Sequence, residues 1–156
     1  MYETRKAYMV DENKVNVKEK NDIFKYPIIN TVTQKDGCKF KYSKEKKGHF
    51  GIPKVIWSNG AGTYPIIDEN GKYGLTQFAY AIVDKKQNLQ KIKDAMNNKK
   101  FINLMKYLAF KEDNKYNYKI IALFKKEFYK YFLPKNHTSL SLSKNKLNRK
   151  PKYNSI

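Results

Sequence analysis

The stretch that most constrains the fold runs from residue 50 to residue 84. Two apolar runs within it, residues 55–57 and 78–83, are rich in β-branched and aromatic residues and end at polar or turn-forming residues, as buried strands do. Four of the seven glycines lie between these runs. The Asn59-Gly60 and Asn70-Gly71 pairs adopt positive φ at little cost, and the second pair predicts a tight hairpin between residues 64–67 and 73–75.

The residues before this stretch predict a further hairpin. Residues 23–33 contain β-forming residues around Pro27, which favours an edge strand or a strand start because proline donates no ladder hydrogen bond. Asp36-Gly37 is a turn signal. Residues 38–43 then alternate aromatic residues and lysines, which is typical of a half-solvated strand. The lysine face is either a solvated edge or a phosphate contact.

After Asp84 the apolar spacing changes from two to nearly four, which predicts amphipathic helices. The apolar positions are Leu89, Ile92 and Met96, followed by Phe101, Leu104, Met105 and Leu108. Asn97-Asn98 marks the break between two helices, and residues 120–128 suggest a third, shorter one. The order predicts an α+β fold: a small mixed or antiparallel sheet built from hairpins, with two to three amphipathic helices packed on one face.

The length of 156 residues suits one compact domain. We expect a polar lead-in at residues 1–21, a single domain at 22–133, and a basic tail at 134–156 that has no acidic residue and is expected to be disordered. The tail either clamps a phosphate backbone nonspecifically or has no role.

Charge is the strongest functional signal, because 33 Lys and Arg stand against 14 Asp and Glu and give a formal net charge of +19. Such a charge favours a polyanionic partner, with nucleic acid as the first expectation. A genome rich in A and T would inflate lysine but would not explain the shortage of acids. Only Arg5 and Arg149 are arginines, so base contacts would fall to Asn, Gln, Ser, Thr and Tyr.

Cys38 is the only cysteine, which excludes an internal disulfide and the usual thiolate zinc sites. No apolar run approaches the roughly 20 residues that cross a bilayer, so no membrane partner is expected. These features indicate an intracellular protein.

A family resemblance becomes visible in the central stretch. The runs GHFGIPKVIWS at 48–58, Tyr64-Pro65 and GKYGLT at 71–76 look like the target-recognition region near the C-terminus of adenine-specific DNA methyltransferases. These enzymes include fused restriction-modification enzymes and relatives in large DNA viruses, so the resemblance implies a location in a bacterial cytoplasm or in a viral factory or virion. The runs at 99–102 and 116–128 extend the similarity over about residues 23–132. The resemblance implies binding to double-stranded DNA and placement of a target adenine for a catalytic domain.

The chain also departs from that family. Methyltransferases of this class carry a glycine-rich cofactor loop and an Asn-Pro-Pro-Tyr or similar motif, and this sequence contains neither. Gly60-Ala61-Gly62 opens a polar loop instead of a helix. We therefore expect no cofactor and no catalysis of its own, and a partner in a separate methyltransferase or nuclease subunit.

Strand ends supply the candidate DNA contacts, because a rigid scaffold can hold short polar side chains against base edges. The candidate base contacts are Ser58, Asn59, Thr76 and Gln77, with Asn117 as a weaker one. Ordinary turn and capping chemistry is their alternative. The candidate phosphate contacts are Lys54, Lys72 and Lys119, which could equally be solvated lysines. Tyr64, Tyr73 and Trp57 could stack on bases, although Trp57 fits a core position better.

Two other functions stay open. A packaging or other structural protein would use the charge to neutralise DNA or to meet acidic protein, without sequence preference. A magnesium-dependent nuclease would use Asp36, Glu45 and Lys47, since Glu-x-Lys on a strand can hold metal and position water. The run of charges around Glu45 favours a solvated loop instead. His49 and His137 are too few for a metal cluster.

Overall fold

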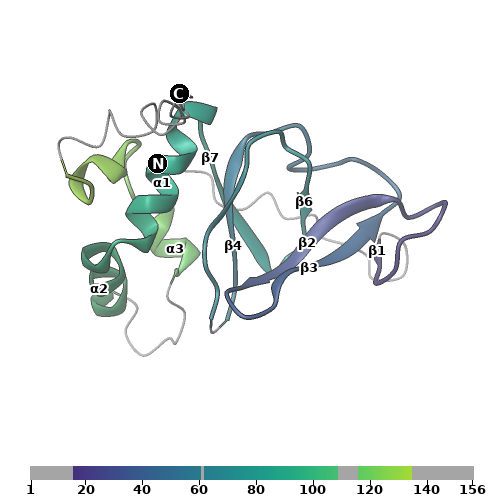
Figure 1. The fold of residues 1–156 in the computed structure, drawn as a ribbon, viewed down its shortest axis with the longest axis horizontal. Coiled ribbons are helices and arrows are strands. Elements are labelled where there is room, and N and C mark those ends of the chain that lie inside the picture. Colours follow the sequence, from purple (N-terminus) through teal and green to yellow (C-terminus); the bar gives the residue numbers. More distant parts are fainter. Residues whose placement is uncertain (1–15, 61, 109–115, 135–156) are drawn as a thin grey trace, which may run out of the picture.

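The computed structural model describes residues 16–60, 62–108 and 116–134 and has an α+β architecture, as the sequence predicts (Figure 1). Its strands are β1 Asn16–Val17, β2 Tyr26–Thr33, β3 Gly37–Ser43, β4 Lys54–Ser58, β5 Ile66–Asp68, β6 Gly74–Leu75 and β7 Ala79–Val83. Its helices are α1 Lys86–Asn97, α2 Lys99–Leu108, α3 Tyr118–Ile121 and the 3-10 helix η1 Phe128–Tyr131. Most of the predicted lead-in and nearly all of the predicted tail lie outside the described residues.

The strands form two sheets instead of one. The first has the order β1-β3-β2-β6, and the second has the order β5-β4-β7 with antiparallel pairing. The β2–β3 hairpin predicted from Asp36-Gly37 is confirmed, with Gly37 at φ 69°. Pro27 is the second residue of β2, which agrees with a strand start. We call β5-β4-β7 the central sheet, because the helices pack on one side of it and the first sheet on the other (Figure 1).

Both faces of the central sheet are buried, which explains the nearly continuous apolar runs in β4 and β7. Val55 and Trp57 of β4 belong to the core that faces the helices, whereas Ile56 belongs to the smaller core that faces the first sheet. This assignment follows from the period of two along a strand. Trp57 is thus a core residue, and β4 is fixed from both sides.

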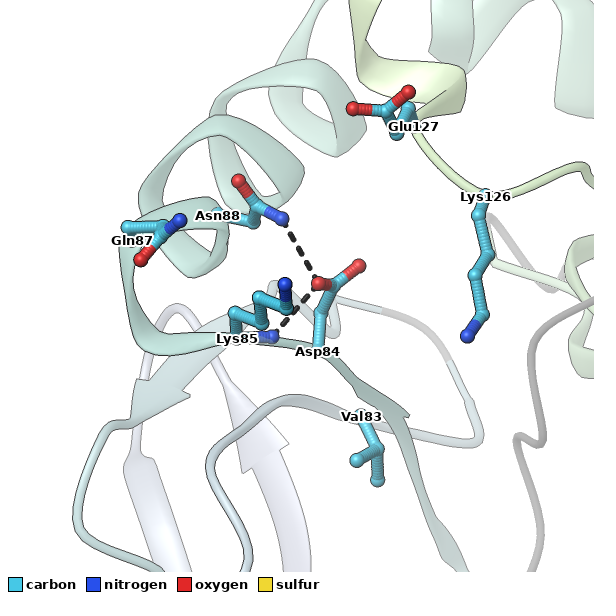
Figure 2. Close-up of a pocket in the computed structure, with 7 residues that line it drawn as sticks. All are labelled: Val83, Asp84, Lys85, Gln87, Asn88, Lys126 and Glu127. Carbon is cyan, nitrogen blue, oxygen red and sulfur yellow. Dashed lines mark hydrogen bonds between the residues drawn. The ribbon is translucent and has the colours of Figure 1, made fainter.

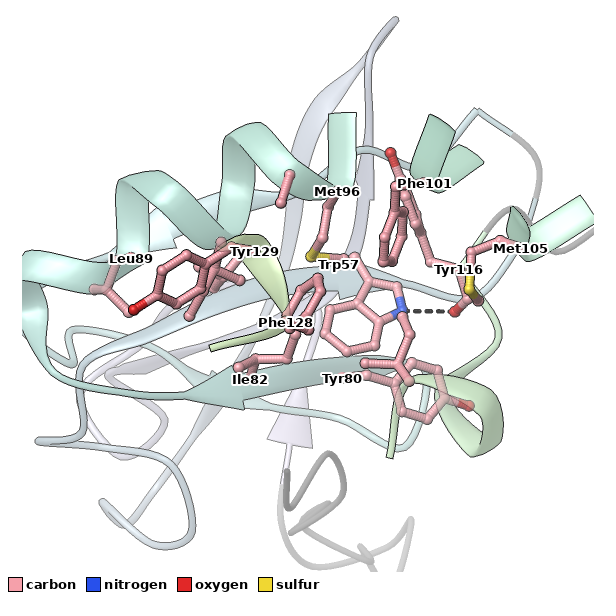
Figure 3. Close-up of a cluster of buried hydrophobic side chains, with 14 residues drawn as sticks. Trp57, Tyr80, Ile82, Leu89, Met96, Phe101, Met105, Tyr116, Phe128 and Tyr129 are labelled. Carbon is pink, nitrogen blue, oxygen red and sulfur yellow. Dashed lines mark hydrogen bonds between the residues drawn. The ribbon is translucent and has the colours of Figure 1, made fainter. Parts of the chain in front are cut away.

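The larger core lies between the central sheet and the helices (Figure 3). The indole Nε1 of Trp57 donates a 2.9 Å hydrogen bond to the carbonyl of Tyr116, which connects β4 to the segment that leads into α3. Phe101 of α2 contacts several aromatic rings, including those of Phe124 and Phe128. Burying each such side chain contributes roughly 1.5–3 kcal/mol. The two helices join at Asn98, as predicted, where the Asn98 side chain accepts a hydrogen bond from the N–H of Lys100.

One prediction of local structure is wrong. Residues 64–67 and 73–75 do not form a hairpin, because β5 pairs with β4 whereas β6 pairs in parallel with β2 in the other sheet. Gly71 does adopt a positive φ of 64°, so a turn exists there without strand pairing. The third helix is shorter than residues 120–128 suggest: α3 has four residues, and Glu127, with a positive φ of 65°, separates it from the 3-10 turn η1. Within the described residues, no helix has the length and apolarity needed to span a bilayer.

Candidate nucleic-acid interface

The predicted contact residues are divided between the two ends of the central sheet. Lys54 begins β4 and Ser58 ends it, so four steps along the strand, or about 13 Å, separate them. Lys72 lies near the Lys54 end of the sheet, in the turn that follows β5. Asn59 and Gln77 lie at the opposite end, where β4 ends and β7 begins. The ten candidates therefore do not form one site.

Lys54 is not a phosphate contact, because its side chain is fully buried. Its Nζ lies 2.6 Å from Oδ2 of Asp68 and also donates to the carbonyls of His49 at 2.9 Å and Ile52 at 3.2 Å. All three ammonium protons thus have acceptors. Burial lowers the pKa of the Lys54 ammonium, and the hydrogen bond and charge of Asp68 act in the opposite direction.

The buried pair has a structural role in the turn after β5. Oδ1 of Asp68 accepts the N–H of Lys72 at 2.8 Å, and Oδ2 accepts the N–H of Tyr73 at 3.0 Å. The carbonyl of Gly71 accepts the N–H of Gly51 at 2.8 Å, which joins this turn to the loop before β4. These bonds hold Lys72 in an exposed position.

Two further candidates are also buried and satisfied internally. Oγ of Ser58 donates to the carbonyl of Val32 at 3.0 Å and accepts its N–H at 2.9 Å, which ties β4 to β2. Oγ1 of Thr76 donates to Oδ1 of Asn30 at 3.3 Å and accepts the N–H of Phe78 at 3.3 Å. Their prediction as base contacts is therefore wrong, because their hydroxyl groups serve the junctions between elements.

The tyrosine candidates are half-buried. Tyr64 and Tyr73 both pack against the smaller core, and the ring of Tyr73 lies 5.3 Å from that of Phe40. Their rings are therefore engaged in packing, which argues against stacking on bases. Asn117 caps α3, with its side chain accepting the N–H of Lys119 at 2.9 Å, whereas the Lys119 side chain is exposed.

Hydrogen bonds show which segments meet at the end of the sheet that carries Asn59. The N–H of Asn59 donates to the carbonyl of Phe78 at 2.8 Å, and the N–H of Gln34 donates to that of Gly62 at 2.9 Å. On the helical side, the indole N–H of Trp57 donates to the carbonyl of Tyr116. The hydroxyl of Tyr116 in turn donates to Oδ1 of Asn97 at 3.3 Å. These bonds set the β2–β3 turn beside the loop that follows β4 on one side of the central sheet, and the starts of α2 and α3 beside Trp57 on the other side.

We call this end the Asn59 edge. Its members are Phe78 and the polar residues Gln34, Lys35, Asn59, Gln77, Lys99, Lys100, Asn117 and Lys119. The side chains of its four lysines are all exposed. Among the described residues of these segments, Asp36 is the only carboxylate, and it forms an ion pair with Lys39 at 3.2 Å. In Figure 1, α2 and α3 lie in the lower part of the view.

The opposite end of the central sheet has a mixed charge. We call it the Lys72 end and define its exposed lysines as Lys72, Lys85, Lys86 and Lys126. An open hollow of about 650 Å³ there is lined by residues of both signs, including Asp84, Glu127, Lys85 and Lys126 (Figure 2). Oδ1 of Asp84 accepts hydrogen bonds from the N–H of Lys85 at 2.7 Å and from Nδ2 of Asn88 at 2.9 Å. Carboxylates weaken the positive potential here.

The residues considered for a nuclease do not come together. Asp36 and Glu45 flank the seven-residue β3 at its two ends, which separates them by about 25 Å. Glu45 forms an ion pair with Lys47, and the hydrogen bond and charge of that lysine lower the pKa of Glu45. No three His, Cys, Asp or Glu side chains gather as metal ligands within the part of the chain that the structure describes.

Sequence reasoning missed Lys35, Lys99, Lys100 and Phe78 as members of the Asn59 edge. Lys99 and Lys100 follow the predicted helix break, so their exposure at a helix start could have been inferred. The placement of the β2–β3 turn and the start of α2 at the same end of the central sheet depends on long-range hydrogen bonds, for which the sequence carries no local signal.

Comparison of the chain with protein-family models, curated proteins and solved structures found no match. The resemblance to target-recognition regions of adenine-specific methyltransferases therefore stays a prediction.

Proposed function

We propose that this protein binds double-stranded DNA through the Asn59 edge. The observation that carries the proposal is that exposed lysines from three separate segments lie at the same end of the central sheet as the amide side chains of Asn59 and Gln77. The net charge of +19 supports a polyanionic partner. Lysines would hold phosphates and set the orientation of the duplex.

The amide side chains of the edge suit base contacts. Asn59 is exposed and Gln77 is half-buried, and both flank strands of the buried central sheet. Asn and Gln can make paired hydrogen bonds to adenine in the major groove. A rigid sheet end holds such groups in fixed positions, which favours recognition over loose electrostatic attraction.

The DNA-binding role that we propose is recognition without catalysis. The resemblance to target-recognition regions and the lack of a cofactor loop and an Asn-Pro-Pro-Tyr motif in this sequence support it. Chemistry on the bound DNA would then come from a separate methyltransferase or nuclease subunit.

The first experiment compares two variants with the same loss of charge. Fluorescence anisotropy with a duplex of about 25 base pairs would measure affinity over a range of salt concentrations. One variant replaces Lys35, Lys99, Lys100 and Lys119 with alanine, and the control replaces Lys72, Lys85, Lys86 and Lys126. Each phosphate contact adds about 0.9 to the slope of log K against log salt, so losing four contacts lowers the slope by about 3 to 4.

We expect this drop for the first variant and little change for the control. The control also tests the sequence prediction for Lys72. Equal losses in both variants would mean that the charge acts without a defined surface, and wild-type protein that fails to bind duplex at moderate salt would refute the proposal.

Sequence preference is tested separately. Selection from a randomised duplex pool should return a preferred site for the wild type, and replacing Asn59 and Gln77 with alanine should weaken that preference while leaving the salt slope unchanged. A pool that stays random with the wild type would favour the packaging role.

A further inference from the structure

Phe78 is an exposed aromatic residue in the Asn59 edge. The sequence predicts it as the first residue of a buried strand, but β7 begins one residue later and 46% of Phe78 is exposed. Its neighbours along the chain, Gln77 and Ala79, are half-buried and buried. The ring has no aromatic contact among the described residues. A binding partner that covers this exposed apolar ring would remove it from water.

The backbone of Phe78 is fixed on both sides. Its carbonyl accepts the N–H of Asn59 at 2.8 Å, and its N–H donates to Oγ1 of Thr76 at 3.3 Å. Thr76 is itself buried, and its N–H donates to the carbonyl of Ile29 at 3.0 Å, so the support reaches the first sheet. Because these hydrogen bonds already order the backbone of Phe78, its ring can contact a partner without a large further loss of conformational entropy.

The surroundings of Phe78 distinguish it from the other exposed apolar side chains. Tyr107 and Leu108 lie at the far end of α2, and Leu123 and Tyr131 follow α3. Phe78 instead lies between the exposed Asn59 and the half-buried Gln77, in the edge that carries four exposed lysines. The exposed lysines of the same edge supply the cations that hold phosphates beside an inserted side chain.

We propose that Phe78 is a wedge that inserts between neighbouring base pairs of the bound duplex and partly unstacks them. Proteins that bend DNA commonly insert Phe, Leu, Ile or Met side chains in this way, while cationic residues beside the wedge hold the phosphates. This inference rests on the proposed DNA binding and adds a distortion of the duplex to it.

Plasmid relaxation measures the distortion without knowledge of the target site. Plasmid would be relaxed by a topoisomerase in the presence of protein at matched occupancy, then stripped of protein, and its linking number compared with a protein-free sample. Insertion unwinds the duplex, so the wild type should leave a reduced linking number. Phe78→Ala should remove most of this shift and weaken binding by between about 5-fold and 100-fold, whereas Phe78→Leu should keep part of both.

Val83→Ala is the matched control, because Val83 is 37% exposed at the other end of β7. We expect it to shift the linking number as the wild type does. Wild-type protein that binds duplex without changing the linking number, or a Phe78→Ala shift equal to that of the wild type, would overturn the wedge and leave the proposed function standing. Wild-type protein that does not bind duplex would overturn both.

Discussion

Replacing Lys54 with methionine should destabilise the protein strongly. Methionine keeps the length and apolar stem of lysine but removes the ammonium group, so Asp68 would remain buried with only the N–H groups of Lys72 and Tyr73 as donors. The carbonyls of His49 and Ile52 would lose the donor that Lys54 supplies. A charge buried without its counterion is therefore the main consequence.

The size of the loss follows from these contacts. Removing one partner of a buried ion pair costs about 3–5 kcal/mol. The two N–H donors that Asp68 keeps reduce this cost, and the two carbonyls that lose a donor add roughly 1 kcal/mol each. We therefore expect Lys54→Met to lower the free energy of unfolding by about 4 kcal/mol. With a urea dependence of about 2 kcal/mol per M, the midpoint should fall by about 2 M.

Urea denaturation followed by the fluorescence of Trp57 would measure this loss. A double variant, Lys54→Met with Asp68→Asn, removes both charges and should recover about 2 kcal/mol of the single loss. Lys72→Met is the control, because that lysine is exposed, and it should change stability by less than about 0.5 kcal/mol. A loss below about 1 kcal/mol for Lys54→Met, or no recovery in the double variant, would refute the reasoning.

Two further predictions concern the backbone and pH. Gly71→Ala should cost about 2 kcal/mol more than Gly37→Ala in urea denaturation, because both glycines have positive φ but a Cβ at Gly71 would clash with the backbone nitrogen of Ile52, whereas the space at Gly37 is open. Equal losses would contradict the packing at Gly71. Burial raises the pKa of Tyr116, so the folded state keeps a proton that the unfolded chain releases above about pH 10. Stability should then fall by about 1.4 kcal/mol per pH unit above that pH from this group alone, and Tyr116→Phe should flatten the decline measured between pH 9 and 11; an unchanged slope would contradict it.

Local signals in the sequence predicted much of this fold. The helical spacing of Leu89, Ile92 and Met96 predicted α1, and Asn97-Asn98 predicted the break before α2. The turn at Gly37 and the burial of β4 were also predicted correctly. In each case the pattern lies within a dozen residues, so the local sequence was enough to predict the element.

The candidate site was less predictable because it depends on which face of a strand a residue occupies. Lys54 and Ser58 alternate with Val55 and Trp57, so they point away from the helices. The sequence does not show that a second sheet covers that other face, and a lysine there looks solvated until its contact with Asp68, fourteen residues away, is known. The hairpin prediction failed for the same reason, because β6 pairs with the distant β2.

The two ends of the central sheet should therefore respond independently to mutation. Lys54 forms a buried ion pair with Asp68, so its charge stabilises the turn after β5 and cannot contact a ligand. The exposed lysines of the Asn59 edge have no such internal role in the described part of the chain. Lys54→Met should thus change stability while the folded fraction keeps the wild-type salt slope, whereas the four-lysine variant of the Asn59 edge should change the salt slope at unchanged stability. Because distant sites are additive, the combined variant should show both losses with no coupling between them.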